Sequence, residues 1–208
     1  MKTAVLDIDG TICDFNVAAV RKFGICDESL YSLELRWPGR EDEIRKFVSN
    51  PLNYLLLRPI DFSWWGVYFL KAIGYKIVVV TARPPGLGMW LVTRFWLWFH
   101  ELAIDKLIVT DFKSKAKLIE SLNPDVAIDD SPAQIVALIG STIKNVVVFT
   151  QPWNKRLEFE GCSRLNGWRA LPFSSVLGLK ITKGWPSRLA WRDTRSQEDY
   201  KDTVSRNL

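Results

Sequence analysis

Two carboxylates near the start of the chain have a spacing that suits nucleophilic or acid–base chemistry. Asp7 and Asp9 follow the apolar residues 4–6 and stand directly before Gly10 and Thr11. Side chains along a strand alternate between its faces, so residues two positions apart point the same way. Two carboxylates this close repel each other unless a cation or a shared proton lies between them. We favour a functional pair over the alternative, a plain turn at a strand end, where Asp-Gly is also common.

A second acidic pair, Asp129 and Asp130, follows the apolar residues 126–128. If both pairs end parallel strands, they meet at the edge of an open α/β sheet where ligands bind. Four carboxylates at one edge need a hard cation, and oxygen ligands beside a phosphate group suit Mg²⁺. We therefore predict a Mg²⁺ site made by Asp7, Asp9 and the second pair. The sequence leaves open which of Asp129 and Asp130 binds the ion directly.

Groups that can hold phosphate oxygens accompany these carboxylates. Thr81 ends a third predicted strand and offers a hydroxyl and a backbone N–H, and Ala82 follows it. A lysine at the start of a later helix would neutralise both the phosphate and the carboxylates. Lys113, Lys115 and Lys117 compete for this role, and we select Lys113 because it is nearest to the predicted start of that helix.

The elements that must position these groups alternate along the chain. Apolar runs predict strands over residues 2–8, 76–80, 106–109, 125–128 and 145–149. Helical spacing predicts helices over residues 14–23, 62–73, 87–102, 114–122 and 132–139. Strands that alternate with helices imply a parallel sheet with right-handed crossovers. The predicted fold class is therefore α/β, with a Rossmann-like core of parallel strands flanked by helices.

Residues 16–60 interrupt this alternation after the first strand. Short apolar clusters, a Pro-Gly step and a charged run predict a small helical cap rather than a further strand–helix unit. An insertion next to the carboxylate pair is in position to act as a lid. We expect the core to comprise residues 1–15 and 61–175.

Composition fits a globular protein of one domain with an insertion. The chain has 208 residues, of which 48% are hydrophobic and 25% are charged. Three cysteines without metal-ligand spacing fit a reducing cytoplasm. We expect no leader, because the chain opens as a buried strand, and no membrane partner, because the most apolar run, residues 89–99, is too short to span a bilayer.

Charge is distributed unevenly along the sequence. Residues 1–150 carry 17 basic and 17 acidic side chains, whereas residues 151–208 carry 11 basic and 6 acidic ones and supply the whole net charge of +5. A basic segment attracts polyanions such as nucleic acid. The alternative is a solvated tail, and we predict a basic C-terminal extension over residues 176–208 that is partly disordered. Before it, we expect Trp168 and Leu171 to pack back onto the core.

The order of these motifs resembles the haloacid dehalogenase superfamily of phosphohydrolases. The matching residues are DxDGT at 7–11, VVVTAR at 78–83, a lysine near 113 and IDDSP at 128–132. The resemblance implies that Asp7 attacks phosphorus to give an aspartyl-phosphate and that Asp9 is the general acid and base. It also implies Mg²⁺ held by Asp7, the backbone carbonyl of Asp9 and the second acidic pair. Thr81, Ala82 and the lysine would hold the phosphoryl oxygens.

A narrower resemblance points to the 5′(3′)-deoxyribonucleotidase family. It rests on Cys-Asp-Phe at 13–15, Leu-Arg-Pro at 57–59, FTQPWN at 149–154 and RLNGWR at 164–169. It implies a small helical cap, a nucleoside monophosphate substrate and stacking of Phe15 on the base. The alternative for Phe15 is a core residue of the first helix. The predicted function is thus a Mg²⁺-dependent phosphomonoesterase, with a nucleotidase as the favoured activity.

Two departures from that family keep another substrate open. Thr-Ala-Arg at 81–83 differs from the usual small residues, and Ser131 stands where some members carry a basic residue. Arg83, with Arg94 and Trp96, resembles instead the 3′-phosphatase domain of polynucleotide kinase-phosphatases, which acts on nucleic-acid ends. Arg83 is accordingly a candidate phosphate ligand, the alternative being a surface ion pair. A catalytically silent binding protein on the same scaffold is the third possibility.

The helix predicted over residues 87–102 is apolar on nearly all sides. One stripe contains Met89, Val92, Trp96 and Phe99, and the other stripe includes Leu91, Phe95 and Trp98. A helix of this kind is buried or lies at an interface. We expect one side in the core and the other in a contact between two copies of the chain, rather than a platform for nucleic acid.

Overall fold

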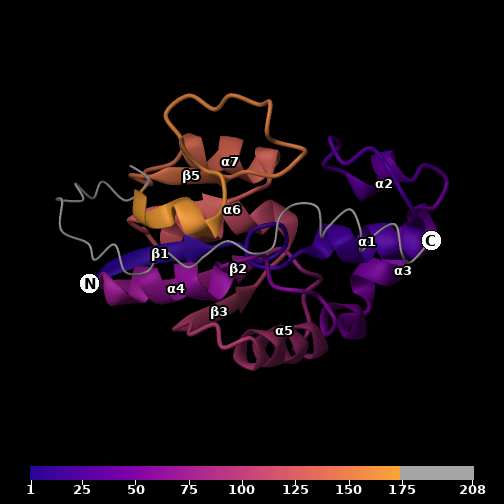
Figure 1. Ribbon diagram of the computed structural model, residues 1–208, viewed down its shortest axis with the longest axis horizontal. Coiled ribbons are helices and arrows are strands. Elements are labelled where there is room, and N and C mark those ends of the chain that lie inside the picture. The colour runs from indigo at the N-terminus through magenta and orange to yellow at the C-terminus, as the bar shows by residue number, and fades with distance from the viewer. Residues whose placement is uncertain (174–208) are drawn as a thin grey trace, which may run out of the picture.

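A computed structural model of the chain describes residues 1–173, which contain a six-stranded parallel sheet (Figure 1). The strand order is β3-β2-β1-β4-β5-β6, and every neighbouring pair is parallel. The strands are β1 (Lys2–Leu6), β2 (Tyr75–Thr81), β3 (Lys106–Val109), β4 (Val126–Asp129), β5 (Val146–Phe149) and β6 (Ser163–Leu165). The predicted fold class, α/β with a Rossmann-like parallel sheet, is confirmed.

Helices cover both faces of the sheet. The core helices are α4 (Ser63–Ala72), α5 (Leu87–Phe99), α6 (Phe112–Ser121) and α7 (Pro132–Ile139), and a 3₁₀ helix covers Trp168–Phe173. Buried side chains of α4 and α5 share one apolar core, and those of α6 and α7 share another, so each helix pair packs on its own face (Figure 1). The central strands are therefore buried on both sides, as their continuous apolar sequence indicates.

The pattern of the central strand explains this two-sided core. In β1, Ala4 and Leu6 pack with the α4 and α5 side, whereas Val5 between them packs with the α6 and α7 side. This is the alternation that a pleated strand imposes. The last residue of the strand is Leu6, so Asp7 emerges where the strand leaves the sheet.

Most predicted elements lie within two or three residues of the observed ones, but one strand was missed. The sequence predicts five strands, the last over residues 145–149, whereas the structure has a sixth strand, β6, which pairs with β5 at the edge of the sheet. Only Leu165 of its three residues is buried, so the short segment has no apolar run to reveal it. The expected packing of Trp168 and Leu171 is confirmed, since both are buried in the core.

The region between β1 and α4 is helical, as predicted. It contains α1 (Phe15–Phe23), α2 (Leu33–Arg36), α3 (Glu41–Ser49) and a 3₁₀ helix over Pro51–Tyr54. Figure 1 shows α1, α2 and α3 at one end of the sheet. Ala19, Phe23, Trp37 and Ile44 form a small core of their own there. We call residues 16–60 the cap; its boundaries and its action as a lid stay predictions.

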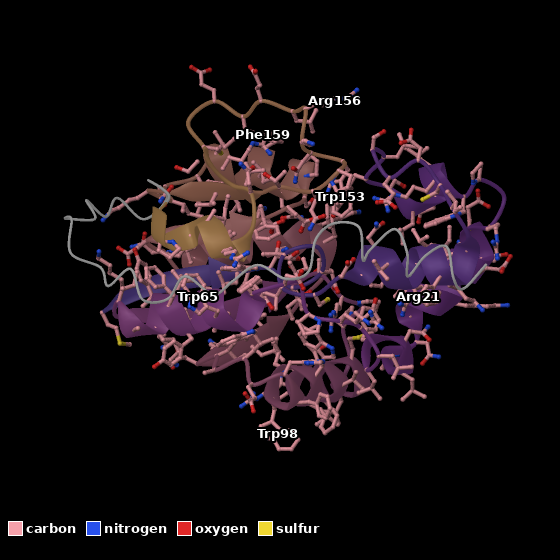
Figure 2. The ribbon with its side chains drawn as sticks, in the orientation of Figure 1. Arg21, Trp65, Trp98, Trp153, Arg156 and Phe159 are labelled. Atoms are coloured by element: carbon pink, nitrogen blue, oxygen red, sulfur yellow. The ribbon has the colours of Figure 1, made fainter. Side chains whose placement is uncertain are left out.

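Helix α5 presents one apolar side to the core and another to the surface. Met89, Trp96 and Leu97 are buried, whereas Phe95 and Trp98 are 50% and 67% exposed. Figure 2 shows Trp98 on the outer side of the helix. The contact between two copies at this surface stays a prediction. Within residues 1–173, no helix has the length and apolar character needed to cross a membrane. The predicted extension 176–208 lies outside the described residues.

Candidate active site

Three acidic side chains converge at the carboxyl ends of β1 and β4. The backbone N–H of Asp7 donates to the carbonyl of Ile128 at 3.0 Å, which continues the pairing of the two strands into the site. Carboxylate oxygens of Asp7, Asp129 and Asp130 all lie within 4.8 Å of one another, and all three residues are buried. The structure thus brings together three of the predicted metal ligands. Asp9 lies nearby but directs its carboxylate to a different partner.

A close approach of the first motif to Asp130 makes this cluster compact. Gly10 has a φ of +85°, which favours glycine, and a Cβ at this position would lie 2.5 Å from Oδ2 of Asp130. The Thr11 hydroxyl donates to Oδ1 of the same carboxylate at 3.1 Å. The Gly-Thr step after the first acidic pair therefore both makes room for the second pair and orients it.

The lysine of the cluster is Lys115, not Lys113. The ammonium of Lys115 lies 2.7 Å from Oδ1 of Asp7 and 2.8 Å from Oδ2 of Asp129, and the side chain is buried. Lys113 is exposed, as is Lys117. The helix begins at Phe112, because the Asp111 side chain caps it by accepting from the N–H groups of residues 113 and 114. Both lysines lie on this helix, and residues two positions apart point to nearly opposite sides of a helix. Lys113 therefore faces solvent, whereas Lys115 faces the carboxylates.

Burial and mutual repulsion dominate the electrostatics of the cluster. Burial raises the pKa of Asp7 to about 7, with Asp129 and Asp9 adding to the rise and Lys115 opposing it. Burial, followed by the charges of Asp7 and Asp129, raises the pKa of Asp130 well above its usual range. One lysine thus does not offset three buried carboxylates. A divalent cation would remove the repulsion, so these residues fit Mg²⁺ by charge and by ligand chemistry.

Arg83 is an internal ion-pair partner of Asp9 rather than a surface residue. Its Nε and Nη2 atoms donate to the two oxygens of the Asp9 carboxylate, both at 2.8 Å. Its Nη1 donates to Thr93 of α5 at 2.9 Å, and the guanidinium lies 4.3 Å from the centre of the Tyr54 ring. Burial raises the pKa of Asp9, but the charge and hydrogen bonds of Arg83 outweigh it and hold that pKa below its usual range. The surface alternative for Arg83 is wrong.

A cavity of about 780 Å³ lies between the cap and the carboxylates. Its lining includes Asp9, Ala82 and Asp130 from the core and Phe15 and Tyr54 from the cap side. The Phe15 ring is partly buried and stacks on Tyr54 with centroids 5.6 Å apart and planes at 25°. Phe15 therefore both packs on the cap and faces the cavity, so neither of its two sequence interpretations is excluded.

Thr81 and several residues not predicted from the sequence complete the surroundings. Thr81 is buried at the end of β2, beside Ala82. Tyr31, Arg36 and Trp153 also line the cavity. Trp153 belongs to the FTQPWN motif, so the sequence offered a reason to place it near the site. Tyr31 and Arg36 belong to no motif, and only the folding of the cap over the sheet brings them to the cavity.

Several solved structures share the fold of this chain. The chain is similar to CbbY from Rhodobacter sphaeroides in complex with phosphate, at 17% identity and a TM-score of 0.54, over 82% of this chain and 96% of that one. It is also similar to D,D-heptose 1,7-bisphosphate phosphatase from B. bronchiseptica, complexed with magnesium and phosphate. That similarity has 14% identity and a TM-score of 0.52, over 82% of this chain and 96% of that one.

A third similar structure is named as a member of the HAD superfamily. It is a HAD-superfamily hydrolase from Ehrlichia chaffeensis, with 13% identity and a TM-score of 0.52, over 86% of this chain and all of that one. Protein-family models give no match to the sequence, and neither do curated proteins. At these identities the similarity concerns the fold. Together with the parallel sheet, the inserted helices and the acidic edge, it shows that the chain has the fold of the haloacid dehalogenase superfamily of hydrolases.

Proposed function

We propose that this protein is a Mg²⁺-dependent phosphomonoesterase that acts through an aspartyl-phosphate intermediate. The observation that carries this proposal is the buried cluster of Asp7, Asp129, Asp130 and Lys115 at the carboxyl edge of the sheet. Mg²⁺ held there by the three aspartates, with the backbone carbonyl of Asp9, would neutralise their charge and that of the phosphate. A buried cluster of this composition, of which Asp130 lines the cavity, suits phosphoryl transfer better than a structural role.

The chemistry requires two carboxylates with different tasks. In the first step an oxygen of Asp7 forms a bond to phosphorus, and the bond from phosphorus to the ester oxygen breaks. The departing oxygen takes a proton from Asp9. In the second step Asp9 takes a proton from water, whose oxygen attacks phosphorus and releases inorganic phosphate and the free Asp7 carboxylate. Lys115, Thr81 and the backbone at Ala82 would stabilise the phosphoryl oxygens during both steps.

The ion pair with Arg83 bears on when Asp9 can carry a proton. While both guanidinium hydrogen bonds hold the Asp9 carboxylate, that carboxylate stays ionised. We propose that the substrate phosphate draws the Arg83 guanidinium toward itself, since guanidinium matches phosphate oxygens as well as carboxylate oxygens. Asp9 is then free to take a proton from solvent and to give it to the departing ester oxygen. This gives Arg83 the phosphate-binding role expected from the sequence.

The favoured substrates are nucleoside and deoxynucleoside 5′- or 3′-monophosphates. A cavity of about 780 Å³ is large enough for a small molecule of this size. Phe15 and Tyr54 give its cap side an aromatic wall, and a base can stack on such rings whatever its identity. The alternative, a 3′-phosphatase acting on nucleic-acid ends, uses the same chemistry at the same carboxylates. Within residues 1–173, we find no feature that favours it over a mononucleotide.

The experiment that tests the function is phosphate release from a substrate panel, with Mg²⁺ and with EDTA. The panel holds nucleoside and deoxynucleoside monophosphates, sugar mono- and bisphosphates and a 3′-phosphorylated oligonucleotide. We expect Mg²⁺-dependent release led by the mononucleotides. Release led by the sugar phosphates or by the oligonucleotide would replace the nucleotidase proposal with that substrate class. No release from any compound would overturn the phosphomonoesterase proposal and favour a silent binding protein.

A further inference from the structure

Trp153 joins the cap to one of the proposed metal ligands. It stands in the loop that follows β5, and Figure 2 shows it where this loop approaches α2. Its indole Nε1 lies 3.2 Å from Oδ2 and 3.3 Å from the backbone oxygen of Asp130, so one N–H serves two acceptors. The two oxygens of the Asp130 carboxylate therefore have different donors, Thr11 on Oδ1 and Trp153 on Oδ2.

Two cap residues hold the other side of the same indole. The guanidinium of Arg36, at the end of α2, lies 4.9 Å from the ring centre, within the range of a cation–π contact. The ring of Tyr31 meets the indole edge to face, with centroids 6.1 Å apart and planes at 63°. Movement of this part of the cap would remove both contacts from Trp153.

Arg36 is itself fixed firmly to the cap. The side chain is buried, its Nε donates to the carbonyl of Leu30 at 2.6 Å, and its Nη1 donates to the side chain of Asn16. A guanidinium anchored in this way follows the cap as a body. By contrast, the backbone oxygen of Asp130 also accepts at 2.8 Å from Asn154, which is tied to the core through the carbonyl of Phe149. The main chain at Asp130 thus has support from the core, whereas the Oδ2 contact runs through a residue that the cap touches.

We propose that Tyr31 and Arg36, acting through Trp153, couple the position of the cap to metal binding at Asp130. The inference rests on the proposed metal-dependent function and adds a positioning role for three residues. Donors that orient a ligating carboxylate influence metal affinity strongly. Coupling of this kind is reciprocal, so bound metal favours the cap position seen here to the same degree as that position favours the metal. A substrate that contacts the cap then strengthens metal binding at the moment the metal is needed.

The test is Mg²⁺ binding by isothermal titration calorimetry to the full-length protein and its variants, without substrate. Arg36→Met keeps much of the side-chain volume but removes the cation. Arg40→Met is the matched control, because Arg40 lies at the same 4.9 Å over a ring, Phe23, that belongs to the cap itself. We expect roughly fivefold weaker Mg²⁺ binding for Arg36→Met, the lower end of typical couplings. We expect wild-type affinity for Arg40→Met.

Two further variants test the coupling without changing Arg36, whose replacement could unfold the protein because its side chain is buried. Tyr31→Leu alters a residue that is 42% exposed and should also weaken Mg²⁺ binding. Trp153→Phe removes the donor to Asp130 and should weaken binding by about tenfold. Incorporated 5-fluorotryptophan gives one ¹⁹F resonance for each of the ten tryptophans, and the one missing in Trp153→Phe identifies Trp153. This resonance should shift in Tyr31→Leu and, in the wild type, on addition of Mg²⁺.

The outcomes separate this inference from the proposed function. If the wild type binds Mg²⁺ and releases phosphate while Tyr31→Leu and Arg36→Met bind Mg²⁺ equally well, the coupling is overturned and the phosphomonoesterase stands. A Trp153 resonance that does not respond to Mg²⁺ would also overturn the coupling. If the wild type binds no Mg²⁺, the metal-dependent function fails and the coupling fails with it.

Discussion

The ammonium of Lys115 lies 2.7 Å from a carboxylate oxygen of Asp7, the proposed nucleophile. The same ammonium reaches Asp129 from the other strand, so one buried cation spans both acidic motifs. It stabilises the ionised form of Asp7, which is the form that the proposed attack on phosphorus requires. In the proposed mechanism, the same ammonium would also contact oxygens of the phosphoryl group that Asp7 receives.

Lys115→Met should lower kcat by at least about a hundredfold, the usual loss when a donor to the developing charge is removed. Lys113→Met is the matched control, because Lys113 is exposed on the first turn of the same helix, and its rate should equal that of the wild type. Steady-state phosphate release measures both. Equal losses in the two variants would contradict the assignment of Lys115.

Asp7→Asn should abolish turnover while leaving the fold intact. The amide cannot form the aspartyl-phosphate, so trapping with substrate at low pH followed by intact-mass measurement should show a phosphorylated protein only for the wild type. Circular dichroism checks the fold. Substantial activity in Asp7→Asn would remove this residue from the role of nucleophile.

The raised pKa of Asp7 also predicts how stability depends on pH without metal. The folded-state pKa, about 7, lies above the ordinary value of 3.8, so the folded protein binds the proton more tightly than the unfolded chain does. The free energy of unfolding should therefore fall as pH rises from about 4 to 7, by at most about 4 kcal/mol from this group. Urea denaturation in EDTA at pH 5 and 7.5 should show a smaller fall for Asp7→Asn, and Mg²⁺ should reverse the fall in the wild type.

Removing Arg83 should destabilise the protein, because it leaves the Asp9 carboxylate without its partner. We expect Arg83→Met to lower the free energy of unfolding by about 3 kcal/mol. The double variant Asp9→Asn, Arg83→Met should recover part of this loss, since the uncompensated charge is gone. A double-mutant cycle by urea denaturation gives the coupling, and strict additivity of the two changes would argue against the ion pair.

Phe15→Ala should raise KM for nucleoside monophosphates by about tenfold if its ring stacks on the base. It should change KM for p-nitrophenyl phosphate far less, because the smaller ester need not reach the cap. Kinetics with both substrates on the same preparation give the comparison. An equal rise for the two substrates would make Phe15 a packing residue of the cap.

Features that depend on local pattern could be read from the sequence, and features that depend on the fold could not. The alternating burial of Ala4, Val5 and Leu6 follows from an apolar run, so the strand before the first carboxylates was predictable. The choice between Lys113 and Lys115 depends on where α6 begins. The helix begins at Phe112, two residues before the predicted start, so the lysine nearest to the predicted start is not the one that contacts the carboxylates.

The contacts around Trp153 were beyond local reasoning for a different reason. Arg36 stands 117 positions before Trp153 in the sequence, and hydrophobic periodicity cannot predict a contact between residues so far apart. The strand Ser163–Leu165 was not predicted, because only one of its three residues is buried and the segment shows no apolar alternation. The acidic motifs were predictable because each directly follows an apolar run, and carboxylates brought together at the buried ends of strands are costly without a cation.

The indole of Trp168 donates to the backbone oxygen of Thr11 at 2.7 Å. The indole fits there because Gly66 has no side chain, since a Cβ at that position would lie only 2.1 Å from the Trp168 ring. The loop that carries the first two aspartates is thus supported by a residue 157 positions later. During synthesis this loop leaves the ribosome early, but Trp168 emerges only after most of the described residues have been made. Nascent chains that extend past Asp130 but end before Trp168 hold Asp7, Asp9, Lys115 and the second acidic pair, yet they lack the hydrogen bond from Trp168 to the first loop.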